Sequence, residues 1–158
     1  MPPRFKPQIE VELIMNSPTA KNSFTRFIPP VARWLLGLPL LVFGLNGFLN
    51  FIPQPEVALP EGAMKFSVAL MESGYMMQLI GITHLMVGLG LITNRFVPLA
   101  LVLLAPFLVN SVAFHVFLEP SGLVPALVFT ALELYLAWQY RAAFAPMLAA
   151  RVKPSASV

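Results

Sequence analysis

The sequence contains no cysteine, which excludes disulfide bonds, cysteine-ligated zinc or iron–sulfur centres and thiol catalysis. Charge is also scarce: 11% of the 158 residues are charged, whereas an average soluble domain has about 25%. Because 58% of the residues are hydrophobic, the chain has too few polar side chains to cover a soluble domain, and it is not typical of disorder. The composition therefore predicts a small multi-pass membrane protein.

Four apolar runs are long enough to cross a bilayer as helices, which takes about 20 residues each. They cover residues 31–52, 74–92, 96–118 and 122–140. Only a helix satisfies its own backbone hydrogen bonds in lipid, and none of the runs alternates as a barrel strand does. The links after the second and third runs have three residues each, which favours antiparallel neighbours. We expect an all-α fold, a polytopic four-transmembrane-helix antiparallel bundle.

The link between the first two runs is long and covers residues 53–73. Its first half is rich in proline, which favours extended or turning backbone. Residues 63–72 have the pattern of a short amphipathic helix. We expect this helix to lie on the outer membrane surface; the alternative is that it folds back under the first span.

The basic residues predict the orientation. In a four-span topology nine of the ten lysines and arginines fall on one side, and only Lys65 falls on the other. Basic residues stay cytoplasmic, so we expect both termini in the cytoplasm and a bacterial-type inner-membrane location. The expected parts are a flexible cytoplasmic tail over 1–30, a membrane domain over 31–148 and a basic tail over 149–158. Because topology explains the basic character, nucleic acid is not an expected partner.

Ionisable side chains inside an apolar run are costly, and they are the first candidates for function. His84 lies eight residues from the predicted cytoplasmic end of its run and Glu133 lies seven, so both are roughly 11 Å deep. A facing imidazole would lower the cost of burying the carboxylate, and the pair could handle a proton or a quinone headgroup. Met77, Gly81 and Gly88 share a helical stripe with His84, which predicts a closely packed face. The alternative is that the pair only stabilises helix packing.

A second layer, roughly 21 Å deep, holds one amide from each of three runs: Asn46, Gln78 and Asn110. We expect these amides to form a hydrogen-bond network that orients the helices; the alternative is that they bind a carbonyl or hydroxyl headgroup. His115 is expected nearer the outer surface, as an interfacial histidine or a further binding group. It lies about 16 Å from His84 in depth, so the two are not axial ligands of one haem, and no metal-site spacing occurs.

From the second run onward the sequence resembles the DoxX-like family of small four-helix membrane proteins. The resemblance covers about residues 29–148, and its most specific parts are FHVFL at residues 114–118 and the closing ELYLAWQYRAAFAPML. Asn50 stands where many relatives have a basic residue. The resemblance implies a four-helix inner-membrane bundle and links to quinol-oxidase, thiosulfate–quinone and oxidative-stress assemblies. It implies no catalytic motif.

Three functions of different classes follow. The favoured one is a non-catalytic accessory or assembly subunit of a larger, redox-linked membrane complex, because no extramembrane domain is present to hold a substrate. Its partners would be the lipid bilayer and other membrane subunits or further copies of the chain. The alternative is a quinone-reactive or proton-handling protein that uses His84 and Glu133, and a less favoured one is a small oligomeric transporter. We do not expect an enzyme or a resident cofactor. Quinone is the one ligand that the sequence leaves possible.

Overall fold

The computed structural model describes residues 26–53 and 58–151, so most of the two predicted tails lies outside the described residues. Within these ranges the fold is all-α and no strand occurs, as the sequence predicts. The helices are α2 (Ile28–Leu49), α3 (Glu61–Glu72), α4 (Met76–Ile92), α5 (Val97–Phe117), α6 (Leu123–Gln139) and the short α7 (Arg141–Phe144), with a 3-10 turn, η1 (Pro120–Gly122), before α6. The helix predicted over residues 63–72 is α3.

Three helical segments are long and apolar enough to cross a membrane: α2, α5, and η1 with α6, which together run from Pro120 to Gln139. The fourth segment is different. α4 is 17 residues long, and it meets α3 at an 87° bend; together the two helices are apolar and long enough to form a broken span or a re-entrant loop. The protein is thus a multi-pass membrane protein with three spans, or four if the bent pair is one of them.

The bend between α3 and α4 has a local chemical cause. The Ser73 hydroxyl donates to the carbonyl of Leu70 at 2.6 Å and accepts from the N–H of Met76 at 3.1 Å, so one side chain serves both helix ends. Gly74 follows with a φ of +76°, a left-handed conformation that glycine adopts without a Cβ clash. The chain therefore changes direction within three residues, at the boundary between the short helix predicted over 63–72 and the apolar run predicted over 74–92.

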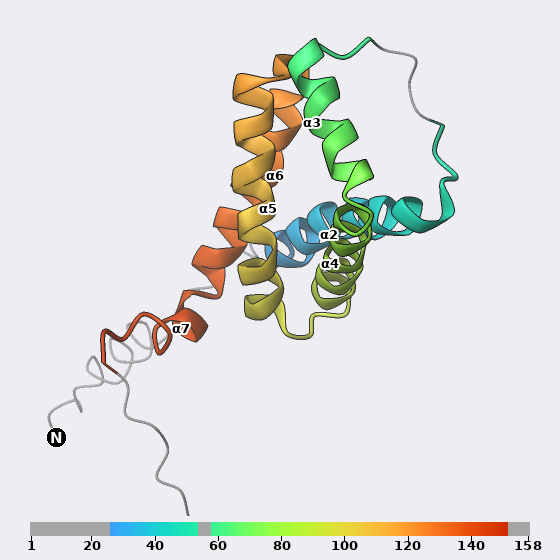
Figure 1. Ribbon diagram of the computed structural model, residues 1–158. Helices are drawn as coiled ribbons and strands as arrows, with labels where there is room; N and C mark the ends of the chain where they lie inside the picture. The colour runs from blue at the N-terminus through green and yellow to red at the C-terminus, as the bar shows by residue number, and fades with distance from the viewer. Residues whose placement is uncertain (1–25, 54–57, 152–158) are drawn as a thin grey trace, which may run out of the picture.

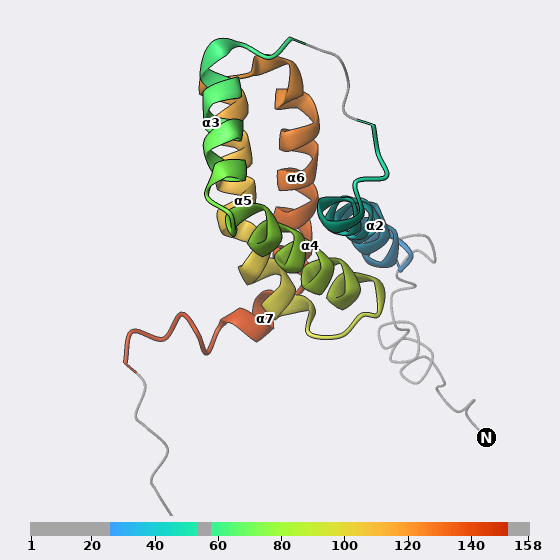
Figure 2. The same ribbon diagram turned by 45° about the vertical axis from the view of Figure 1, so that its right-hand side comes forward.

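The helices form two pairs (Figures 1 and 2). α5 and α6 stand side by side, while α2 and α4 form a second, antiparallel pair that crosses the first at a large angle. The predicted four-helix antiparallel bundle, with all axes aligned, is therefore not confirmed. α3 runs beside α5, and the rings of Phe66 and Phe114 lie 5.6 Å apart between centroids, so α3 is not an isolated surface helix.

The α2–α4 pair is held by a very close approach of the two backbones. A Cβ built on Gly88 would lie 2.9 Å from the carbonyl oxygen of Gly37, and one on Gly44 would lie 3.0 Å from that of Gly81. Between helices in lipid, close van der Waals packing replaces the hydrophobic effect as the main attraction. Gly81, His84 and Gly88 are all buried, so the closely packed stripe predicted on this helix is confirmed at these three positions. Met77, its fourth predicted member, is exposed, because it lies in the first turn of α4 beyond the close approach to α2.

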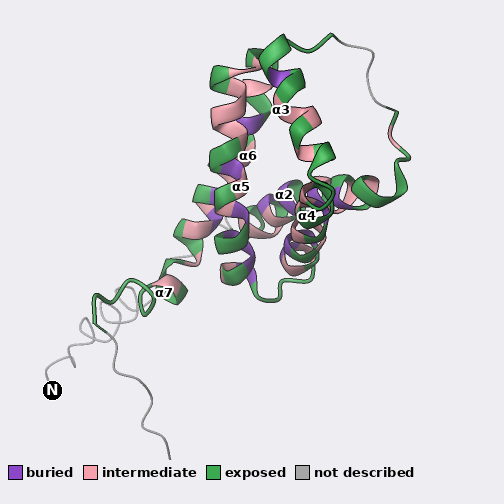
Figure 3. Ribbon diagram, in the orientation of Figure 1, coloured by how far each residue is buried: buried purple, intermediate pink, exposed green. Residues whose placement is uncertain are grey.

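The buried residues gather where the two pairs meet (Figure 3). The largest fully buried side chains come from all four long helices and are Leu36, Val87, Leu91, Leu104 and Leu136. Most other apolar side chains on α5 and α6 point outward and are exposed, as lipid-facing residues are.

Replacing Gly88 with alanine should destabilise the protein. The new Cβ would lie 2.7 Å from Leu41 Cγ and 2.9 Å from the backbone of Gly37, so the two helices must separate. We expect a loss of about 1–3 kcal/mol, the usual cost of overpacking, measured by thermal unfolding in detergent. Gly47→Ala is the matched control, because its Cβ would meet nothing closer than 3.9 Å. Equal melting temperatures for the two variants would contradict the close approach.

Candidate functional site

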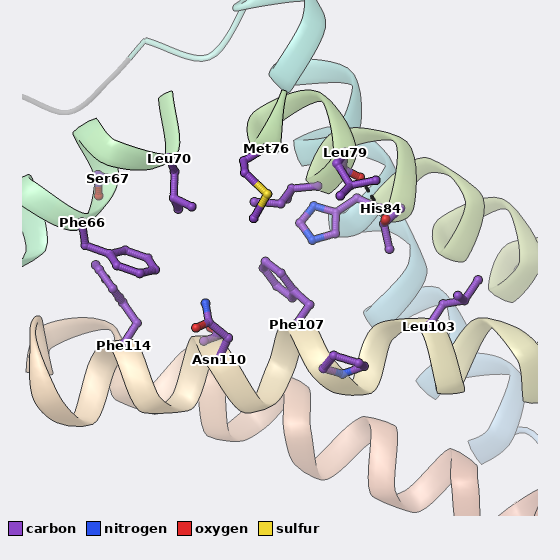
Figure 4. A pocket seen from close by; sticks show the side chains of 14 residues that line it. Phe66, Ser67, Leu70, Met76, Leu79, His84, Leu103, Phe107, Asn110 and Phe114 are labelled. Carbon is purple, nitrogen blue, oxygen red and sulfur yellow. Dashed lines mark hydrogen bonds between the residues drawn. The ribbon is translucent and has the colours of Figure 1, made fainter. Parts of the chain in front are cut away.

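A cavity of about 640 Å³ lies between α3, α4 and α5 (Figure 4). α5 lines it with one helical stripe at positions 103, 107, 110 and 114, which are spaced by four, three and four residues and therefore share a face. α3 contributes Phe66 and Leu70 from the opposite side, and the first turns of α4 close the cavity between them. The bend at Ser73 makes this space, because it turns α4 away while α3 stays beside α5.

The lining is mainly apolar with a few polar side chains. Three phenylalanines line it, at positions 66, 107 and 114, and the polar groups come from Ser67, Thr83, His84, Asn110 and Ser111. The Thr83 hydroxyl donates to the carbonyl of Leu79 at 2.9 Å, so its oxygen can still accept a hydrogen bond. An apolar cavity of this size with few convergent polar groups is typical of a small-molecule site.

His84 forms the α4 wall of the cavity next to Phe107. The two rings meet edge to face with 4.3 Å between their centroids, and Figure 4 shows them facing each other. His84 is buried, and its Nε2 atom has no hydrogen-bond partner among the described residues. A buried nitrogen of this kind is costly unless a ligand or another group hydrogen-bonds to it.

The predicted contact between His84 and Glu133 is not formed in the described part of the chain. Glu133 is buried, but its Oε1 atom also lacks a hydrogen-bond partner, and no ion pair joins the two residues. The reason is helix order: α4 packs mainly on α2 and α5, and α6 packs on the same two helices rather than on α4. Equal depth along the sequence therefore does not place the two side chains within hydrogen-bond or ion-pair distance.

The three predicted amides do not form a network either, since no hydrogen bond joins them within the described residues. The Asn46 side chain accepts from the N–H of Ile52 at 2.7 Å and so stabilises the chain as it leaves α2. Gln78 is exposed, and Asn110 lines the cavity from α5. The depth count assumes upright helices, and the crossing of the two pairs invalidates it. Only His84 and Asn110 of the predicted residues meet at one site.

His115 belongs to a different structure, the link between α5 and α6. Its Nδ1 lies 2.8 Å from the carbonyl oxygen and 3.1 Å from Oε2 of Glu119, so this nitrogen donates to one residue four positions ahead. The Glu119 carboxylate also accepts from the Ser121 hydroxyl and from the N–H groups of Ser121 and Gly122. The hydrogen bond from the Ser121 hydroxyl is the largest cause that lowers the pKa of Glu119 below its usual range. The two backbone N–H groups and His115 lower it further. His115 and Glu119 thus fasten the link, and their i, i+4 spacing is a signal that sequence reasoning missed.

The stability that Glu119 contributes should depend on pH. A carboxylate whose folded-state pKa is lowered stabilises the fold above its unfolded pKa, about 4.3, and loses this effect as pH falls through the lower value. We expect Glu119→Gln to melt earlier than the wild type at neutral pH, with a difference that shrinks as the pH drops below about 4.3. Glu61→Gln is the control, because that side chain is exposed and pairs only with Lys65. A difference that grows at low pH would contradict this role.

No protein-family model, curated protein or solved structure matches the chain. The resemblance of the sequence to the DoxX-like family therefore stays a prediction. The cavity beside His84 is the feature of the described residues from which a function can be inferred.

Proposed function

We propose that this chain is an accessory subunit of a membrane complex that holds an amphiphilic, ring-headed ligand of the quinone class in the cavity between α3, α4 and α5. The observation that carries the proposal is the cavity itself, an apolar space of about 640 Å³ beside a buried imidazole nitrogen without a partner. The larger complex would be redox-linked, and the chain would bind the ligand without transforming it.

The lining suits a flat ring with an apolar tail. Phe107 and Phe114 offer aromatic surface on one wall, and Phe66 and Leu70 offer apolar surface on the other. Flat rings stack well on such side chains, at a gain of about 0.5–1.5 kcal/mol beyond area burial. The cavity volume also falls within the roughly 300–1,000 Å³ of ordinary ligand sites.

Two polar side chains would recognise the headgroup. Asn110 is one turn along α5 from Phe107, and its amide makes no hydrogen bond to the described residues, so it is able to donate to a carbonyl. His84 offers Nε2, which donates or accepts according to its tautomer. Either group would gain a partner on binding, which supports a carbonyl- or hydroxyl-bearing ligand over a pure hydrocarbon.

A proton-handling function has less support. It required His84 and Glu133 to exchange a proton, and the two side chains share no hydrogen bond among the described residues. An oligomeric transporter also has less support, because the cavity is lined by one side of α5 and does not run through the helix pairs. We therefore favour binding over turnover.

The proposal includes four crossings, with α3 and α4 as one broken span, in a bacterial-type inner membrane with cytoplasmic termini. Hydrogen bonds from Arg33 to Tyr140 and from Tyr140 to Asn94 support an even number of crossings, because they gather the start of α2, the α4–α5 link and the end of α6 at one end. At the other end, a Cβ on Gly62 would lie 3.2 Å from the Leu118 side chain, so the start of α3 is next to the α5–α6 link.

Cysteine labelling tests this orientation, and the absence of native cysteine keeps the background low. A membrane-impermeant thiol reagent should label the Glu61→Cys variant in intact spheroplasts, whereas Arg95→Cys should react only after permeabilisation. The physical reason is the retention of basic segments in the cytoplasm. Labelling of both variants from outside would contradict the four-span topology.

Filling the cavity should weaken ligand binding. Leu70→Trp adds a large ring on the α3 wall, and we expect it to weaken binding of a short-tailed ubiquinone analogue by at least about tenfold, because the ligand would be displaced. Binding is measured as the ligand-dependent rise in melting temperature of the detergent-solubilised protein. Mass spectrometry of protein purified from native membranes should also find bound quinone.

Two further variants separate binding from folding. Leu127→Trp is the control, since Leu127 is exposed on α6 and outside the cavity, and it should bind as the wild type does. Asn110→Leu should melt normally without ligand and bind about five- to tenfold more weakly, the value of one hydrogen bond. Unchanged binding in Leu70→Trp would overturn the proposed site.

A further inference from the structure

The end of the molecule that carries the α4–α5 link and α7 lies opposite the α5–α6 link (Figure 1). A chain of hydrogen bonds from Arg33 through Tyr140 to Asn94 joins its segments. Arg33 of α2 donates from a terminal guanidinium nitrogen to the Tyr140 hydroxyl at 2.8 Å. That hydroxyl donates in turn to Asn94 Oδ1 at 3.1 Å. Three segments far apart in the sequence therefore meet at the Tyr140 hydroxyl, which holds the Arg33 guanidinium in a defined position.

The charge of Arg33 has no acidic partner among the described residues. The ion pairs among all the described residues are Lys65 with Glu61 and His115 with Glu119, and neither involves Arg33. The guanidinium is partly buried, and its Nε–H lacks any hydrogen-bond partner there. A positive charge taken out of water is costly unless an anion faces it. The tyrosine orients the group but does not neutralise it.

Two further arginines flank this centre. Arg95 follows Asn94 directly and Arg141 follows Tyr140, and both are exposed. Arg141 lies over the ring of Trp138 with 4.9 Å between its Cζ atom and the ring, and it donates to the Trp138 carbonyl at 3.0 Å. Exposed tryptophans collect at the headgroup level of a membrane. Positive charge and aromatic surface are thus combined at this end of the molecule.

We propose that this end of the protein is a binding site for the phosphodiester of an anionic phospholipid, with Arg33 as the central contact and Arg95 and Arg141 beside it. Guanidinium groups present parallel N–H donors that match two phosphate oxygens. Basic pockets between membrane helices are suited to anionic headgroups. Tyr140 and Asn94 are positioning residues here, because they orient Arg33 and need not touch the lipid. The site is separate from the cavity and does not depend on the proposed ligand there.

The test compares lipids that differ in net charge. Purified protein is titrated in detergent with phosphatidylglycerol or with phosphatidylcholine, and bound lipid is counted by native mass spectrometry while melting temperature is followed. Phosphatidylglycerol should bind and raise the melting temperature, and phosphatidylcholine should do so much less. Arg33→Gln should weaken phosphatidylglycerol binding by more than about tenfold, because the central charge-assisted contact is lost. Lys65→Gln, at the other end of the molecule, should bind as the wild type does.

Exposed variants keep the test decisive if Arg33→Gln does not fold. Arg95→Gln and Arg141→Gln should each weaken binding about fivefold without lowering the melting temperature of the lipid-free protein. Tyr140→Phe keeps every charge but releases Arg33, so it should lower the preference for phosphatidylglycerol over phosphatidylcholine. Equal binding of the two lipids, or normal phosphatidylglycerol binding in both exposed variants, would overturn the proposal. So would inorganic phosphate giving the same stabilisation at equal concentration, since the site would then bind free phosphate.

Discussion

The close approach of α2 and α4 determines where the other helices can pack. Because glycines at positions 37 and 44 meet glycines at positions 88 and 81, the two backbones come almost into contact and α4 follows α2 rather than α5. α5 and α6 then pair with each other and cross this unit. The part of α5 that α4 leaves uncovered is flanked by α3, and the cavity lies between them. A contact that depends on four glycines thus determines where the ligand cavity lies.

Much of the secondary structure follows from the sequence because apolar run lengths and short links are local signals. The runs predicted over 96–118 and 122–140 differ from α5 and α6 by a residue or so at each end. The sequence predicts a break between a helix over 63–72 and a run from residue 74, and α3 and α4 are separated there. The angle between the two helices was not predicted, because it depends on the hydrogen bonds of Ser73 and the backbone of Gly74. Hydropathy reports how long a segment is apolar and carries no information about its direction.

The candidate site was predictable only in part, for a related reason. The burial of His84 follows from the small residues on its own helix, a pattern within one element. Its partner depends on which helix lies opposite, and here that is α5 with Phe107 rather than α6 with Glu133. Counting depth treats the helices as upright and mutually adjacent, and both assumptions fail once two pairs cross. The pairing of His115 with Glu119 needs no such assumption, because both residues lie within one turn of chain.

The bend at Ser73 also has an electrical consequence. A helix carries a macrodipole, with about half an elementary charge at each end, positive at the N-terminus and negative at the C-terminus. The negative end of α3 and the positive end of α4 therefore meet beside the cavity, next to Leu70 and Met76. Two opposite partial charges separated by a few residues produce a fixed local field without any ionised side chain. A dipolar headgroup in the cavity would be aligned by this field before it formed a single hydrogen bond.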